Sequence, residues 1–161
     1  MAMEKKVALV TGASRGIGQA IAKELAMDES LTVIGTATTE DGASSISHYF
    51  SKWGLDGDGI KMDVSDPESV TEGIKQVTQA YGPPLIVVNN AGITRDGLLM
   101  RMKEEDWDNV LNTNLSSIYR VSKAALRGMT RRAGDELLTL ALLLRKWAMQ
   151  ARQTIVLPRQ A

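Results

Sequence analysis

Three glycines lie in the segment Thr11–Gly18 (TGASRGIG), between a short β-branched run and a helical pattern. Glycine lets a backbone turn sharply and approach a phosphate closely. The first turn of a helix adds N–H donors and positive potential. This arrangement predicts binding of a dinucleotide pyrophosphate. The alternative is a plain strand-to-helix turn, because a glycine-rich pattern alone is weak and its context decides.

In a dinucleotide-binding fold, the end of the second predicted strand would lie next to the adenosine ribose. A ribose 2′-hydroxyl is usually bound by Asp or Glu at this place. This chain has Gly35-Thr36-Ala37-Thr38 there, and Arg15 lies in the first turn. Arginine and hydroxyl side chains suit a 2′-phosphate, which needs positive charge and hydrogen-bond donors. We therefore expect NADP(H) in preference to NAD(H), the alternative being that Arg15 is a solvated loop cation.

Polar residues also follow the third and fourth predicted strands. Asp63 and Val64 close the third, and Asn89–Gly92 (NNAG) close the fourth. Ligands of open α/β sheets lie outside the carboxyl ends of the strands. An Asp there can accept from the amino group of adenine or cap a helix. The two amides and Gly92 can bind a ribose or brace a neighbouring strand, and for Asn89 the purely structural role is equally open.

An alternation of strands and helices must position these residues. Pro67 at the first position of the third helix, with Asp66 as its cap, is a typical helix start. Four strand–helix alternations are typical of a parallel sheet with right-handed crossovers. We therefore expect an α/β fold, a Rossmann-like doubly wound parallel sheet that is incomplete, with about four strands and flanking helices. Periodicity predicts strands at 7–10, 31–36, 59–62 and 85–88, and helices at 17–26, at 41–53, from 67 through 77, and at 104–128.

Composition excludes several classes of function. Lys and Arg number 19, and Asp and Glu also number 19, so no basic excess indicates nucleic-acid binding. The chain has no Cys and one His, His48, which excludes thiolate metal sites and His-rich metal sites. No run approaches the ~20 apolar residues of a membrane span. The apolar run after Lys6 is also too short for a secretory signal.

The order and spacing of these motifs resemble the short-chain dehydrogenase/reductase family. The resemblance rests on TGASRGIG, Asp63-Val64, NNAG and the segment 112–115 (NTNL). The stretch 92–102 (GITRDGLLMRM) is more specific. It resembles the 3-oxoacyl-[acyl-carrier-protein] reductases, NADPH-dependent ketoreductases of type II fatty-acid synthesis. The resemblance covers residues 5–129, so we expect an NADP-binding domain at 1–129 and an atypical tail at 130–161.

The resemblance implies roles for individual residues. Thr38 would lie by the 2′-phosphate, Asp63 and Val64 by adenine, and Asn90, followed by Ala91 and Gly92, by the nicotinamide-side ribose. Asn114 would be the Asn of the catalytic Asn-Ser-Tyr-Lys tetrad, where it helps to hold a proton-relay water. The phosphates would be held by Gly12, Ser14, Arg15, Gly16, Ile17 and Gly18.

The resemblance also implies partners and a location. The substrate would be a 3-oxoacyl thioester of acyl carrier protein, in the cytoplasm, with neither nucleic acid nor membrane as a partner. Members of the family form homo-tetramers. The tetramer contacts lie largely in the half of the family pattern that this chain does not match, so the sequence leaves the oligomeric state of this chain open.

The remaining tetrad residues are missing from their expected place. The family has a Ser after a fifth strand and then Tyr-x-x-x-Lys on the next helix, whereas the last Ser here is Ser122 and the last Tyr is Tyr119. Tyr119 and Lys123 have the right spacing. They lie, however, on the same predicted helix as Asn114, so we interpret them as non-catalytic. The sequence therefore resembles a reductase that is inactive as written, and a non-catalytic NADP(H)-binding fragment or interaction protein is the alternative. A third interpretation is a fragment that does not fold stably.

The tail differs in composition from the rest of the chain. Residues 127–161 hold seven basic and two acidic residues, against 12 and 17 in residues 1–126. By pattern, residues 135–153 form a helix, or the tail is disordered. We hypothesise an out-of-frame origin. Permitted codons for 135–144 and 146–156, shifted into one other frame, encode segments resembling the family's fifth strand with its Ser and the approach to its Tyr. An unrelated replacement tail is the alternative.

Overall fold

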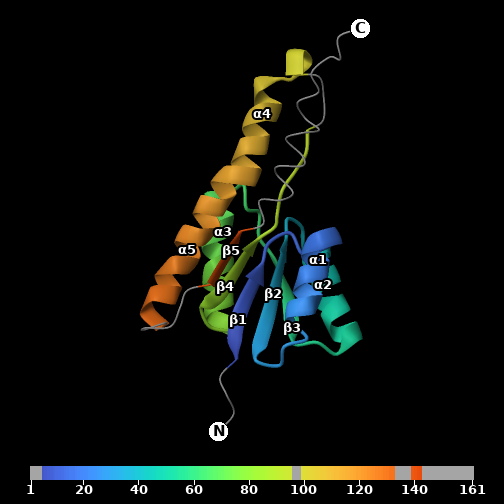
Figure 1. The fold of residues 1–161 in the computed structure, drawn as a ribbon, viewed down its shortest axis with the longest axis vertical. Helices are drawn as coiled ribbons and strands as arrows, with labels where there is room; N and C mark the ends of the chain where they lie inside the picture. The colour runs from blue at the N-terminus through green and yellow to red at the C-terminus, as the bar shows by residue number, and fades with distance from the viewer. Residues whose placement is uncertain (1–4, 96–98, 133–138, 143–161) are drawn as a thin grey trace.

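The chain folds into a parallel five-stranded sheet between two layers of helices, as Figure 1 shows. This computed structural model describes residues 5–95, 99–132 and 139–142. The Rossmann-like α/β fold expected from the alternation is confirmed. The structure adds a short fifth strand to the four that periodicity predicts.

Each predicted strand and helix up to residue 89 is found within a few residues of its expected place. At α3, Asp66 caps the helix as predicted, because its Oδ1 accepts from the backbone N–H of Glu68 at 3.0 Å. The elements are β1 (Lys6–Val10), α1 (Gly16–Leu25), β2 (Leu31–Ala37), α2 (Glu40–Trp53), β3 (Gly57–Lys61), α3 (Pro67–Ala80) and β4 (Pro84–Asn89).

The single helix predicted over 104–128 is wrong in one respect. It is divided into α4 (Glu104–Leu111), a π-helical turn η2 (Asn112–Ser116) and α5 (Ser117–Arg132), after a short 3₁₀ turn η1 (Leu99–Arg101). A π turn inserts one extra residue into the helix, and such insertions often lie at functional sites. Here the turn contains Asn114.

The strand order is β3-β2-β1-β4-β5, and every neighbouring pair is parallel. Val10 at the end of β1 aligns with Gly35 on one side and Val88 on the other. The chain order therefore reverses between β1 and β4. In doubly wound sheets the ligand crevice lies outside the carboxyl ends of the strands at this point.

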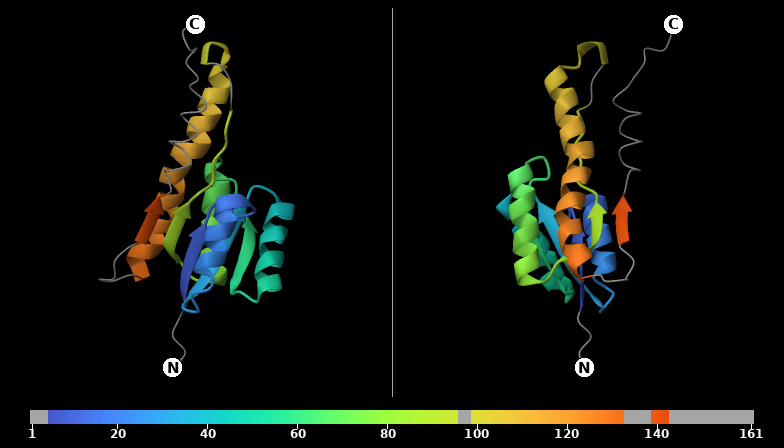
Figure 2. Two further views of the ribbon diagram at one scale, coloured as in Figure 1. Left: turned by 45° about the vertical axis from the view of Figure 1, so that its right-hand side comes forward. Right: turned by 90° about the vertical axis from the view of Figure 1, so that its left-hand side faces the viewer.

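Helices lie on both faces of the sheet (Figure 2), and an apolar layer on each face packs them against it. On one face α1 and α2 bury Ala22, Ile46 and Phe50 against β1 and β2. On the other face α3 and α5 bury residues such as Val77 and Val121. The carboxyl ends of the strands are left between the two layers, next to the loops that carry the candidate site.

The edge strand β3 is fixed to its neighbours by Asp58. Its carboxylate accepts hydrogen bonds from the Ser47 hydroxyl on α2 and from the Tyr81 hydroxyl, the latter at 2.6 Å. Burial opposes the charge of Asp58, but these bonds and one from the Gly59 N–H outweigh it and lower the pKa of Asp58. The same bond to Asp58 raises the pKa of Tyr81 to about 12. These hydrogen bonds to the charged Asp58 therefore join the edge strand β3 to α2 and to Tyr81, directly after α3.

The described part of the tail forms β5 (Thr139–Leu142), which pairs in parallel with β4 from Ile86 to Asn89. The helix expected over 135–153 is therefore wrong at these four residues. The backbone groups of this Thr- and Leu-containing segment can be hydrogen-bonded to the unpaired edge of β4 as well as within a helix. The other residues expected in that helix lie outside the described ones.

Candidate functional site

At Gly12 and Gly18 the first turn and the start of α1 approach their neighbours too closely for a side chain. Gly12 has φ +65°, and a Cβ there would lie 2.9 Å from the Cα of Ala91. A Cβ on Gly18 would overlap the carbonyl oxygen of Gly12 and the Nδ2 of Asn90. The start of α1 therefore lies directly against the turn, and its backbone N–H groups border the switch point.

The N-terminus of α1 has no capping side chain. Arg15 is its N-cap residue and makes no capping hydrogen bond, and no acidic residue lies in the first turn. In contrast, α2 is capped by Thr39 and α3 by Asp66. Unsatisfied N–H groups and the helix dipole at α1 are suited to a phosphate. The donors present thus fit the pyrophosphate that the sequence predicts.

Thr11 and Asn90 join the turn to the end of β4. The Oγ1 of Thr11 accepts from the backbone N–H groups of Asn90 and Ala91, both at 3.0 Å. In return, the Nδ2 of Asn90 donates to the carbonyl oxygens of Thr11 and Gly12, also at 3.0 Å. Asn90 therefore braces the turn. Sequence reasoning did not select Thr11, although a hydroxyl residue directly before the first glycine was the available signal.

The other side of the turn is held by β2 and α2. The backbone N–H of Ala13 donates to the Thr36 carbonyl at 2.9 Å, and the buried Tyr49 hydroxyl donates to the Ala13 carbonyl at 3.2 Å. Burial raises the pKa of Tyr49 to about 12, so the hydroxyl stays a donor at neutral pH. Tyr49 is a second supporting residue that sequence reasoning missed, since its helical spacing indicates only a core position.

Arg15 and Thr38 are both exposed. They adjoin, in sequence, Ser14 and Ala37, which lie close to Gly42 of α2. A Cβ on Gly42 would touch the Ala37 Cβ at 2.7 Å and lie 3.9 Å from the Ser14 Cβ. Within the described ranges, the Arg15 guanidinium makes no hydrogen bond or ion pair. Its charge is therefore available to an anion beside the end of β2.

Asp63 shapes the loop between β3 and α3. Its Oδ1 accepts from the Ser65 N–H at 2.9 Å and from the Ser65 hydroxyl at 2.7 Å. Because Asp66 caps α3, Asp63 is not the helix cap. The side chain of Val64 is buried in the core, so its contact with adenine would be made by its backbone. In the part of the chain that the structure describes, no hydrogen bond uses the Asp63 Oδ2, so this oxygen can accept from an adenine amino group.

Asn114 is buried in η2, and both ends of its amide are hydrogen-bonded to the backbone of one residue. Its Oδ1 accepts from the Ile93 N–H at 2.8 Å, and its Nδ2 donates to the Ile93 carbonyl at 2.9 Å. Gly92 gives it room, since a Cβ there would lie 3.1 Å from the Oδ1. The side chain thus fixes the loop that follows β4. The water-holding role implied by the resemblance stays a prediction.

Two further contacts attach η2 and α5 to the strands. The Nδ2 of Asn112 donates to the Ser65 carbonyl at 3.2 Å, and the Arg120 guanidinium donates to the carbonyl and Oδ1 of Asn112. Asn89 donates to the Ser122 hydroxyl at 3.5 Å, which is the bracing role left open above. Asn112 and Arg120 therefore couple the Asp63 loop to the turn that contains Asn114.

Tyr119 and Lys123 lie away from this site. The Lys123 Nζ donates to the Tyr119 hydroxyl at 2.9 Å, and the Tyr119 side chain is 64% exposed. Both residues line a groove between α3 and α5, whereas Asn114 is buried against the β4 loop.

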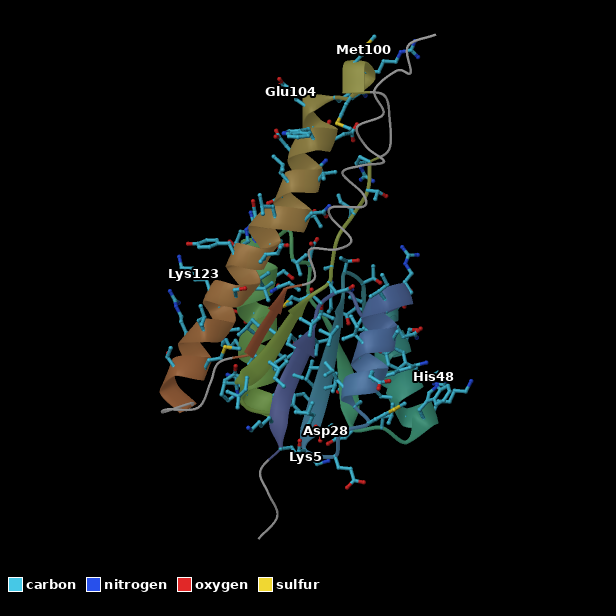
Figure 3. All side chains as sticks on the ribbon, in the orientation of Figure 1. Lys5, Asp28, His48, Met100, Glu104 and Lys123 are labelled. Carbon is cyan, nitrogen blue, oxygen red and sulfur yellow. The ribbon has the colours of Figure 1, made fainter. Side chains whose placement is uncertain are left out.

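Metal and membrane functions gain no support. Among residues 5–95, 99–132 and 139–142, no group of three or more His, Cys, Asp or Glu side chains could hold a metal ion. Within the same ranges, no helix combines the length and apolarity needed to cross a membrane. His48 lies exposed on α2, as Figure 3 shows.

Comparison with known proteins gives a family. The model of the family described as short chain dehydrogenase matches residues 6–140, past Met129, where the motifs end. The chain is 57% identical over 131 residues to the 3-oxoacyl-[acyl-carrier-protein] reductase FabG of Pseudomonas aeruginosa. It is 51% identical over 140 residues to the protein of the same name from Vibrio harveyi, and 49% identical over 140 residues to that of Escherichia coli.

The similarity covers most of this chain but only part of each relative. The matched segment is 81% of the chain and 53% of the P. aeruginosa protein, and 87% and 56% for the other two. The chain therefore spans about half the length of the curated relatives it matches.

Proposed function

Because this chain belongs to the short chain dehydrogenase family, we propose that it binds a nicotinamide adenine dinucleotide, NADP(H) in preference to NAD(H). The observation that carries the proposal is the uncapped N-terminus of α1, set closely against the turn at Gly12 and Gly18 and next to the unpaired charge of Arg15. Backbone donors and a positive dipole serve the pyrophosphate, and a free guanidinium serves a 2′-phosphate.

The other site residues take positions along the same crevice. Thr38 would contact the 2′-phosphate, and the Asp63 Oδ2 and the Val64 backbone would contact adenine. The Oδ1 of Asn90, with Ala91 and Gly92, would face the nicotinamide-side ribose. The pyrophosphate would be held by Gly12, Ser14, Gly16, Ile17 and Gly18 of the first turn.

The bound cofactor would supply a hydride, and in a complete enzyme of this kind the acceptor would be a 3-oxoacyl thioester of acyl carrier protein in the cytoplasm. After Tyr119 the sequence contains no further Tyr, and after Ser122 no further Ser. Asn114 is then the one residue of the tetrad in place. We therefore propose a protein of the 3-oxoacyl-[acyl-carrier-protein] reductase type that is inactive as written, with a non-catalytic NADP(H)-binding fragment or interaction protein as the alternative.

Replacing Arg15 tests the cofactor preference. Arg15→Ala should weaken NADPH binding by roughly 10- to 150-fold, because a charge-assisted hydrogen bond contributes ~1.5–3 kcal/mol. NADH lacks the 2′-phosphate and should lose much less. Isothermal titration of both cofactors measures the difference. Lys75→Ala, which removes an exposed cation of α3, should change neither affinity. Equal losses for NADPH and NADH in Arg15→Ala would show that Arg15 does not face the 2′-phosphate.

A further inference from the structure

The loop between β3 and α3 is held by a residue of η2 that lies far away in the sequence. The Nδ2 of Asn112 donates to the Ser65 carbonyl at 3.2 Å, across 47 positions. In the part of the chain that the structure describes, the other hydrogen bonds of residues 63–66 all stay within the segment 63–70. Asn112 therefore supplies the hydrogen bond that ties this loop to a distant part of the fold.

The amide of Asn112 is itself oriented by Arg120, in the first turn of α5. The Arg120 guanidinium donates to the Asn112 carbonyl at 3.3 Å and also to the Asn112 Oδ1. Because a donor occupies the Oδ1 end of the amide, the Nδ2 end is the one that faces the Ser65 carbonyl. Helix α5 packs beside α3 on one face of the sheet, as Figure 2 shows. The two residues thus join α5 to the loop that precedes α3.

Ser65 passes this contact on to Asp63. The N–H and the hydroxyl of Ser65 both donate to the Asp63 Oδ1, at 2.9 and 2.7 Å. Since both donors hold the same oxygen, the orientation of the carboxylate follows the position of Ser65. The Oδ2 is then the oxygen that faces a base. A carboxylate oxygen accepts a hydrogen bond from an amino group and repels a carbonyl oxygen, so its direction bears on which base is accepted.

We propose that Asn112 is a positioning residue that sets the selectivity of the cofactor site for adenine. It acts by holding Ser65 and, through Ser65, the Asp63 carboxylate. Without the bond from Asn112 the loop is free to shift, and the amino group of adenine is bound less well, whereas the phosphate donors at the start of α1 are unaffected. The inference rests on the proposed binding of NADP(H) and adds a residue that does not itself touch the cofactor.

Titration of the 161-residue chain with NADPH and with its hypoxanthine analogue tests the inference. The analogue carries a 6-oxo group in place of the 6-amino group of adenine. The unchanged chain should bind NADPH more tightly than the analogue. Asn112→Ala should weaken NADPH binding by about two- to tenfold, the contribution of one hydrogen bond, and should change binding of the analogue much less. Asn109→Ala is the matched control, because Asn109 is exposed on α4 and should alter neither affinity.

Asn112→Asp separates positioning from stability. Aspartate keeps an oxygen for Arg120 and removes only the donor to Ser65. The urea midpoint should therefore fall less than in Asn112→Ala, while the preference for NADPH over the analogue falls at least as far.

Three results would overturn the inference. Equal effects of Asn112→Ala on NADPH and on the analogue, including no effect on either, would leave Asn112 with a structural role at most. An undiminished preference for NADPH in Asn112→Asp would show that the bond to Ser65 does not position Asp63. Equal binding of both compounds by the unchanged chain would show that Asp63 does not contact the amino group, although the proposed cofactor binding would stand. Binding of neither compound would contradict the proposed function as well.

Discussion

Purified chain, mixed with NADPH and an acetoacetyl thioester, is expected to show no turnover above background. Hydride transfer to a ketone leaves an alkoxide, and a positioned general acid contributes ~10²–10⁴-fold to such a step. Asn114 cannot supply that proton, because a carboxamide is not an acid near neutral pH, and its amide instead bonds the backbone of Ile93. Tyr119 is exposed and lies beside α3. The loss of NADPH absorbance measures the rate, with an intact relative as the positive control.

Two variants test the cause of the expected lack of turnover. Tyr119→Phe should leave any residual rate unchanged, and a rate that disappears on this substitution would make Tyr119 and Lys123 the acid and its partner. Restoring the alternative reading frame near codon 130 should bring activity back, since that frame can encode a Ser and a Tyr where the family has them. Turnover comparable to an intact relative by the unchanged chain would contradict the interpretation as a non-catalytic protein.

Gly18→Ala should reduce both the stability of the fold and the affinity for NADPH. Alanine is favoured over glycine by ~1 kcal/mol inside a helix. Its Cβ would nevertheless overlap the Gly12 carbonyl and the Asn90 amide, so the turn must move away from α1. Overpacking of this kind costs ~1–3 kcal/mol and occasionally more. We expect a net loss of stability and a loss of NADPH affinity of tenfold or more, by the ~1.4 kcal/mol that corresponds to each factor of ten.

Urea unfolding and NADPH titration of the same sample measure both effects. Gly16→Ala is the matched control, because a Cβ there meets nothing within 4 Å although φ is +60°. It should cost only the ~1–2 kcal/mol of a left-handed residue. Equal losses in the two variants would show that backbone conformation, and not the close approach at Gly18, controls the site.

Much of the fold was predictable because each signal was local. The β-branched run before Gly12 and the Asp66-Pro67 helix start depend on neighbours in sequence, and the structure has both elements in place. The open α/β sheet then follows from alternation and crossover handedness. The glycine-rich turn was likewise local, and its uncapped helix supports the prediction that it binds phosphate.

The supporting residues were not predictable in this way. Thr11 contacts Asn90 across 79 positions, and Tyr49 reaches Ala13 across 36, so no periodicity marks either bond. The π turn at Asn114 adds one residue to a pattern that looks like continuous helix. β5 forms because β4 offers an unpaired edge, which overrides a local pattern that favours a helix.

Hydrogen exchange with and without NADPH tests the proposed cofactor site most directly. The account predicts slower exchange for the amides of Ser14–Gly18 at the start of α1 and for the loops at Asp63–Val64 and Asn90–Ile93. It predicts no change along the groove between α3 and α5. The same experiment with NADH should protect α1 less. Unchanged exchange at the start of α1 in a folded chain, or protection confined to the α3–α5 groove, would contradict the account.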